Sequence, residues 1–172
     1  MRNYSPSAWT AICISIAALV HFALGFAIEF SVDEAHYALY AQRLAWSYFD
    51  HPPLVGWIQW PLVALTSSEG LIRLIPELLW IIACILVYLV TLELHRYIQN
   101  RHTNFLTSNL PSSNLSGLMA VLAIIAAPMP HILAIGLLPD SILAPLSLGI
   151  LWMALRWLRP ESFRLGEWLL LG

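Results

Sequence analysis

Residues 8–27 read AWTAICISIAALVHFALGFA and contain no lysine, arginine, aspartate or glutamate. A helix that crosses a membrane needs about 20 mostly apolar residues, and this stretch is long enough. It is too long for the apolar region of a secretory signal peptide, which has about 7–15 residues, and no small-residue cleavage site follows it. The stretch therefore predicts a retained membrane-spanning helix near the N-terminus.

Similar apolar stretches follow along the chain. We expect spans over about residues 8–29, 70–93, 117–138 and 141–158, and residues 168–172 look like the opening of a fifth. Pro76 is expected to bend the second span, and Pro128 and Pro130 to interrupt the third. The composition agrees, because 59% of the 172 residues are hydrophobic and 10% are charged, against about 25% charged in ordinary soluble domains. The predicted fold class is an all-α membrane protein.

The positions of the arginines predict the orientation. All eight cationic residues are arginines. With the N-terminus inside, Arg43 and Arg73 lie outside, and the positive-inside rule is satisfied by the other six, which are Arg2, Arg96, Arg101, Arg156, Arg159 and Arg164. We therefore expect a multi-pass protein of the cytoplasmic (inner) membrane, with residues 30–69 as an outer loop. The net charge of −2, without a charged tail, argues against a nucleic-acid partner.

The first half of the outer loop predicts a helix. Ser31 is followed three residues later by Glu34, which is the pattern of a capping box at a helix start. A helix beginning there carries Asp33 in its first turn, where a carboxylate stabilises the helix dipole whether or not it has another function. The face that holds Asp33 continues through residues three or four apart, namely Tyr37, Tyr40 and Leu44.

The second half of the loop predicts a stiff turn and a short helix at the membrane surface. Pro52 and Pro53 restrict the backbone and hold His51 in an extended conformation. The apolar run over residues 54–65 is too short to span a membrane. Because Trp57 and Trp60 are aromatics of the kind enriched at the water–lipid boundary, we expect this helix to lie in the interface.

Three strings in these segments resemble one family of membrane enzymes. Residues 33–37 (DEAHY), 47–54 (SYFDHPPL) and 73–76 (RLIP) look like the bacterial relatives of dolichyl-phosphate-mannose–protein mannosyltransferases. These are glycosyltransferases of the GT-C fold, and the lipid A aminoarabinose transferases belong to the same group. Residues 138–140 (LPD) resemble the short second outer loop of that family, where Thr-Pro-Asp is common. The resemblance covers nearly the whole chain in order. Such enzymes have more spans, so residues 1–172 are expected to be the N-terminal part of a truncated GT-C-type bundle.

The resemblance implies a reaction and a set of residues. The enzyme moves a sugar from a polyprenyl-phosphate carrier to a hydroxyl of a lipid, glycan or protein acceptor at the outer face of the membrane. The position of the family's catalytic base matches Asp33, which takes the acceptor's proton while the carrier phosphate leaves with inversion. The substrate-binding candidates around this base are Glu34, Tyr37, His51, Arg73 and Asp140.

Several of these residues have simpler structural explanations. The capping role alone would explain Glu34. Arg73 could be an anchor that snorkels to the interface, and Asp140 could be an N-cap of the fourth span. No cofactor or metal is expected, because one histidine with scattered carboxylates has no metal-site spacing. Cys13 and Cys84 lie in apolar runs and form no disulfide framework.

A transporter, or a non-enzymatic membrane subunit, is the alternative. A transporter is expected to have paired halves and broken helices with polar groups near the membrane midplane. Pro128 and Pro130 break one helix, yet no second half of the sequence mirrors it. His21 and His131, in the first and third spans, are expected to be buried polar groups that bond to a neighbouring helix.

Overall fold

A computed structural model of the chain describes residues 5–49, 51–101 and 111–158. Every regular element in these residues is a helix, so the prediction of an all-α fold is confirmed. The eight helices are α1 (Pro6–Ala27), α2 (Val32–Gln42), α3 (Leu54–Leu65), α4 (Glu69–Ile72), α5 (Leu74–Arg101), α6 (Ser113–Ala126), α7 (Pro128–Ile135) and α8 (Pro139–Trp157). The expected start of a fifth span, residues 168–172, lies outside the described part of the chain.

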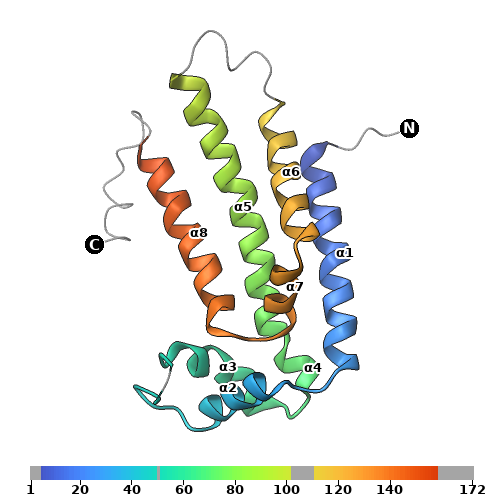
Figure 1. Ribbon diagram of the computed structural model, residues 1–172, viewed down its shortest axis with the longest axis vertical. Coiled ribbons are helices and arrows are strands. Elements are labelled where there is room, and N and C mark those ends of the chain that lie inside the picture. Colours follow the sequence, from blue (N-terminus) through green and yellow to red (C-terminus); the bar gives the residue numbers. More distant parts are fainter. Residues whose placement is uncertain (1–4, 50, 102–110, 159–172) are drawn as a thin grey trace.

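The long helices form a bundle, and the short helices of the first loop close one of its ends. In Figure 1, α1, α5, α6 and α8 run along the long axis, with α5 packed against both α6 and α8 and α6 packed against α1. Helices α2 and α3 pack against each other below the bundle. The predicted outer loop therefore forms a helical layer at the end of the bundle where α1 ends and α8 begins.

Two of the expected spans are long and apolar enough to cross a membrane. They are Pro6–Ala27 and Glu69–Gln99, and the pair α6 and α7 makes a third if it counts as one span bent by 74°. The fourth expected span forms α8, which is not in this group. Its 19 residues include Asp140 in the first turn and Arg156 in the last, and these charges shorten its apolar part.

Prolines affect the spans differently. Pro76 is the third residue of α5, and the span is broken at Arg73, between α4 and α5. Because Pro76 has no N–H to donate to the carbonyl of Ile72, the last residue of α4, the break lies where this proline is expected to act. Pro128 does interrupt the third span as predicted, and it begins α7. The second span is also longer than expected, because polar residues extend α5 to Arg101.

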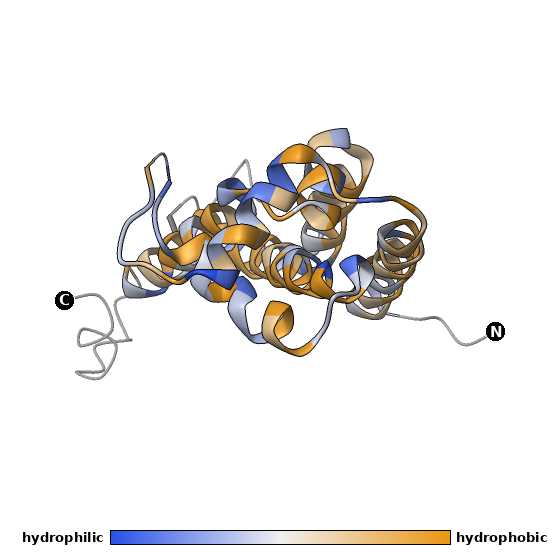
Figure 2. Cartoon of the chain, turned by 90° about the horizontal axis from the view of Figure 1, so that it is seen from below, coloured by the Kyte–Doolittle hydropathy of each residue, from blue (hydrophilic) through white to orange (hydrophobic). Residues whose placement is uncertain are grey.

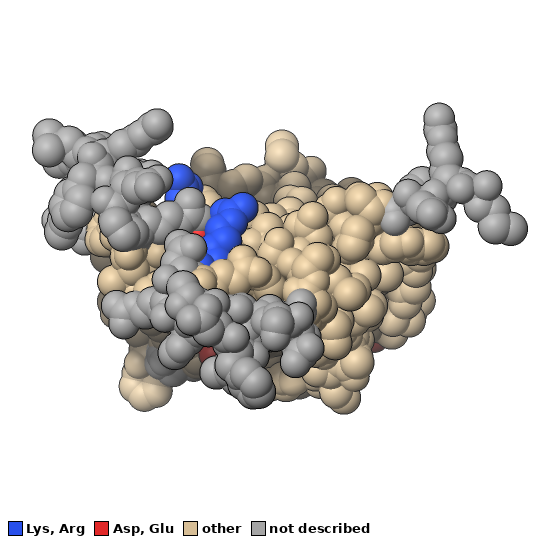
Figure 3. Space-filling model, turned by 90° about the horizontal axis from the view of Figure 1, so that it is seen from above, with Lys and Arg blue, Asp and Glu red and all other residues tan. Residues whose placement is uncertain are grey.

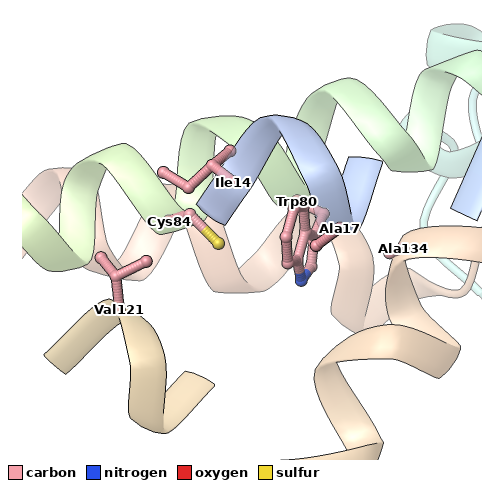
Figure 4. Close-up of a cluster of buried hydrophobic side chains, with 6 residues drawn as sticks. All are labelled: Ile14, Ala17, Trp80, Cys84, Val121 and Ala134. Carbon is pink, nitrogen blue, oxygen red and sulfur yellow. The ribbon is translucent and has the colours of Figure 1, made fainter. Parts of the chain in front are cut away.

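The described core is small and the outer faces of the helices are apolar. One buried cluster joins α1, α5, α6 and α7 through Ile14, Ala17, Trp80, Cys84, Val121 and Ala134 (Figure 4). Only 22% of the apolar window in each of the two spans is buried. Much of the helical chain is apolar (Figure 2), and many large apolar side chains are exposed, including Leu19 at 69% exposure. Exposure of such apolar faces to water is unfavourable, whereas lipid solvates them.

The arginines of the described residues separate toward the two ends of the bundle. Arg96 lies in the last turns of α5 and Arg156 in the last turn of α8, at the end seen in Figure 3. Arg43 follows α2, and Arg73 lies between α4 and α5, at the opposite end. This separation is what a positive-inside arrangement requires. The orientation itself stays a prediction.

Candidate functional site

Helix α2 begins at the capping box that the sequence predicts. The backbone N–H of Glu34 donates to the Ser31 hydroxyl at 3.3 Å, and the backbone N–H of Ser31 donates to Glu34 Oε2 at 2.9 Å. Two N–H groups that the helix itself leaves unpaired are thereby satisfied. Asp33 consequently lies in the first turn, as expected. The helix ends at Gln42, so Leu44 does not continue its face, contrary to our prediction.

Glu34 also joins α2 to the bundle through a buried ion pair. Arg73 donates from Nε to Glu34 Oε1 at 2.8 Å and from Nη2 to Glu34 Oε2 at 3.1 Å. Both residues are buried, with exposures of 4% for Arg73 and 7% for Glu34. A bidentate pair of this kind fixes direction as well as distance. The start of α2 is therefore held against the start of α5.

Arg73 binds the C-terminal end of α1 at the same time. Its Nη1 donates to the carbonyl oxygens of Gly25 at 2.8 Å and Ile28 at 2.6 Å, and its Nη2 donates to the carbonyl of Glu29 at 2.9 Å. With the two bonds to Glu34, all five N–H donors of the guanidinium are used. A cation near the last carbonyls of a helix is also favoured by the helix dipole. Arg73 is thus buried and fully bonded, whereas a snorkelling anchor would keep its charged head in water.

The His-Pro-Pro turn contacts α2 through aromatic side chains. Tyr37 and His51 are hydrogen-bonded between the tyrosine hydroxyl and Nε2 at 3.1 Å, with their rings edge to face. One turn later, Tyr40 stacks on Tyr48 with ring centroids 3.8 Å apart. The Tyr48 hydroxyl donates to the backbone carbonyl of Tyr40 at 2.8 Å. Asp50, in the same predicted turn, lies outside the described residues.

The second outer loop packs onto the same face of α2. Tyr37 forms a buried cluster with Val55 of α3, with Leu137 of the second outer loop and with Ile142 of α8. A Cβ added to Gly136 would lie 3.7 Å from the Glu34 side chain, so the loop passes close to the ion pair. The expectation that the two outer loops approach each other is therefore confirmed.

A hydroxyl in α8 holds this second loop in shape. The Ser141 hydroxyl accepts a hydrogen bond from the backbone N–H of Leu138 at 3.2 Å. It lies 3.0 Å from the carbonyl of Leu133 and 3.1 Å from that of Gly136, to which it can donate. Asp140 occupies the first turn of α8 and does not cap it, because the N-cap position is Leu138. The N-cap explanation for Asp140 is therefore wrong.

Asp33 and Asp140 are both exposed at this end of the molecule. Within the described chain, the Asp33 carboxylate accepts no hydrogen bond and forms no ion pair. Asp140 lines a cavity of about 210 Å³ whose other walls are apolar, formed by Pro52, Leu54, Val55, Pro139, Ile142, Leu143 and Leu146. The structure thus brings Asp140 to the His-Pro-Pro turn, while Asp33 stands on the exposed first turn of α2. No described contact joins the two aspartates.

Sequence reasoning missed a second polar cluster, deeper in the bundle. His21 Nδ1 lies 3.0 Å from Glu77 Oε2, and His21 Nε2 lies 2.6 Å from His131 Nδ1. The expectation that both histidines bond to neighbouring helices is confirmed. The sequence did offer one indication that Glu77 has a buried partner. Glu77 lies in an apolar span, where an ionisable residue requires a partner.

Comparison of the chain with models of protein families, with curated proteins and with solved structures finds no match in any of the three.

Proposed function

We propose that this chain carries the catalytic base of a membrane glycosyltransferase that takes sugar from a polyprenyl-phosphate carrier outside the cytoplasm. The observation that carries the proposal is that the neighbours of Asp33 fix the helix start on which it lies. The residue after it, Glu34, is fixed by the capping box and by Arg73, whereas the Asp33 side chain is exposed. A rigid helix start that presents a carboxylate without a partner among the described residues is what a general base needs.

The proposed reaction assigns Asp33 the proton of the acceptor. The acceptor hydroxyl donates its proton to the carboxylate of Asp33 while its oxygen attacks the anomeric carbon of the sugar. The bond from that carbon to the phosphate oxygen breaks on the opposite side, and the polyprenyl phosphate leaves with the electron pair. General-base assistance of this type contributes about 10²–10⁴ in rate.

Glu34 and Arg73 act as positioning residues in this proposal. Every N–H of Arg73 already donates within the chain, so binding the departing phosphate would break a bond to Glu34 or to a carbonyl of α1. The negative charge that develops on the phosphate requires donors from elsewhere.

Tyr37, His51 and Asp140 line the region between the two outer loops. Tyr37 is 6% exposed and therefore acts mainly through its hydrogen bond to His51. The apolar cavity beside Asp140 suits part of a hydrocarbon chain, with the carboxylate at its edge facing the polar part of a lipid-linked substrate. Membrane lipid and the lipid-linked donor are thus the proposed partners.

The experiment is sugar transfer in membranes from cells that express the natural gene of this chain. Transfer from a radiolabelled polyprenyl-phosphate sugar is measured for the wild type, Asp33→Asn and Glu29→Gln. Glu29 is the matched control, because it is an exposed acid in the neighbouring loop. We expect Asp33→Asn to lose about 10²–10⁴ in rate at unchanged expression, while Glu29→Gln stays near the wild type. Equal activity of all three proteins would remove Asp33 from the mechanism.

A proton-coupled transporter is the second candidate, and one observation favours it. The helix pair α6 and α7 is bent by 74°, and the buried His21 and Glu77 and the partly buried His131 lie beside the break. Broken helices with ionisable residues inside a bundle are typical of transporters. Proton-driven uptake of a solute by proteoliposomes, without sugar transfer, would favour this function over the first.

A further inference from the structure

The break between α6 and α7 leaves one backbone carbonyl with a side-chain partner. In an unbroken helix the carbonyl of Ile125 would accept from the N–H four residues later. Pro128 begins α7 after the chain has turned by 74°, and His131 Nε2 lies 2.6 Å from the Ile125 oxygen instead. A carbonyl only accepts hydrogen bonds, so Nε2 of His131 must carry a hydrogen.

This hydrogen determines what the neighbouring groups can hold. The next contact joins Nδ1 of His131 and Nε2 of His21, and one of these two nitrogens must donate. The contact after it joins Nδ1 of His21 and a carboxylate oxygen of Glu77. If Glu77 is ionised it only accepts, and His21 must then donate to it.

Counting the hydrogens along these contacts leaves three arrangements that need the fewest protons. With Glu77 ionised, either His21 or His131 carries hydrogens on both ring nitrogens and is positively charged. With Glu77 protonated, both histidines are neutral and the carboxyl donates to His21. In each arrangement the three side chains together have zero net charge and hold one proton more than two neutral histidines and a carboxylate.

We propose that His21, Glu77 and His131 form a proton-binding site inside the bundle, in which one proton is shared among three groups. Removing that proton would leave a net negative charge among apolar side chains, which is costly. The bound proton therefore also holds α1, α5 and α7 together at the break. This inference is independent of the proposed glycosyltransferase activity.

The surroundings of the site are largely apolar. His21 is 4% exposed and Glu77 is 7% exposed, and Trp80 packs edge to face on His21 with centroids 4.7 Å apart. An almost wholly apolar cavity of about 420 Å³, bounded by α1, α6 and α7, includes both histidines in its lining. Glu77 Oε1 and Trp80 Nε1 are buried without a hydrogen-bond partner in the described chain.

The other ionisable groups that face the site do not compensate its charge. Arg73 lies one turn before Glu77, between α4 and α5, and is fully bonded to Glu34 and to the end of α1. Cys84 lies two turns after Glu77 on the same helix, and Cys13 on α1 lines the cavity. Helix α6 has no ionisable residue and α7 has only His131, while α8, which packs on α5, has Asp140 and Arg156 near its ends.

The first test locates the proton in the full chain, in lipid nanodiscs near neutral pH. Histidine nitrogens are observed by ¹⁵N NMR with assignments from His21→Gln and His131→Gln, and carboxyl groups by infrared difference spectra against Glu77→Gln. We expect a doubly protonated ring at His21 or His131, or a protonated carboxyl band that Glu77→Gln removes. Two neutral rings without such a band would overturn the proposal.

The second test uses charge compensation and does not require an assignment of the proton. His21→Gln removes the histidine that bonds Glu77 and can carry the compensating positive charge, so we expect a lower Tm. The double variant His21→Gln/Glu77→Gln removes the charge as well and should melt above His21→Gln, or fold where the single variant does not. His36→Gln is the control, because His36 is exposed and its hydrogen bond to the Tyr40 hydroxyl lies at the surface, so it should melt close to the wild type. A double variant no more stable than His21→Gln would contradict a shared proton.

Discussion

Arg73 donates to both carboxylate oxygens of Glu34, at 2.8 and 3.1 Å, across 39 residues of sequence. This pair joins the start of α2 to the start of α5, and the other donors of the guanidinium hold the end of α1. Three helices therefore meet at a single buried side chain. The position of Asp33, which precedes Glu34, depends on this junction.

Replacing Arg73 should destabilise the fold strongly. Arg73→Ala leaves Glu34 as a buried charge without its partner, and loss of one member of a buried pair costs about 3–5 kcal/mol. Arg73→Lys should recover little, because an ammonium group cannot reproduce the bidentate geometry. Thermal unfolding in detergent measures both effects. Arg43→Ala is the control, since Arg43 is exposed and should change stability by less than about 0.5 kcal/mol.

Removing the cap of α2 should loosen only the start of that helix. Ser31→Ala loses the hydroxyl that accepts from the N–H of Glu34, a change that costs about 1 kcal/mol at N-cap positions. Hydrogen exchange at the amide of Glu34 should become faster, while exchange in the middle of α5 stays unchanged. Uniformly faster exchange would mean that the cap supports the whole bundle.

Glu34 and Asp33 should respond differently to the loss of charge. Glu34→Gln keeps the shape of the side chain but removes the charge that pairs with Arg73, so both Tm and activity should fall. Asp33→Asn should lower activity alone, because the Asp33 side chain is exposed and has no partner in the described chain. Sugar transfer and thermal unfolding of the same two preparations separate these outcomes. A stable Glu34→Gln variant that lacks activity would indicate direct contact of Glu34 with substrate.

The contact between α2 and α3 should not tolerate a side chain at Gly56. A Cβ there would lie 2.9 Å from Tyr40 Cβ and 3.1 Å from the Tyr40 backbone carbon, and backbone atoms cannot rotate away. Gly56→Ala should therefore push α3 away from α2 and cost about 1–3 kcal/mol. Gly149→Ala is the matched control, because nothing lies within 4 Å of its added Cβ. Thermal unfolding of the two variants tests the difference.

Features that depend on neighbouring residues in the chain were predicted well. The capping box at Ser31 and Glu34 gave the start of α2, and the apolar run over residues 54–65 became α3. Pro128 interrupted the third span, where it is the first residue of α7. The second span is broken at Arg73, three residues before Pro76, and the sequence pattern did not place this break at the right residue.

The roles of the polar residues in the bundle depended on partners far away in the chain. By itself the sequence determined that the chain is helical, that its helices are apolar enough for lipid, and that an acidic helix start follows the first span. Only the tertiary structure decided that Arg73 binds Glu34 and α1, and that His21 joins Glu77 to His131, partners 56 and 110 residues away. The physical reason is that apolar periodicity and caps reflect bonds within one or two turns, whereas a buried charge is satisfied by whichever helix packs beside it.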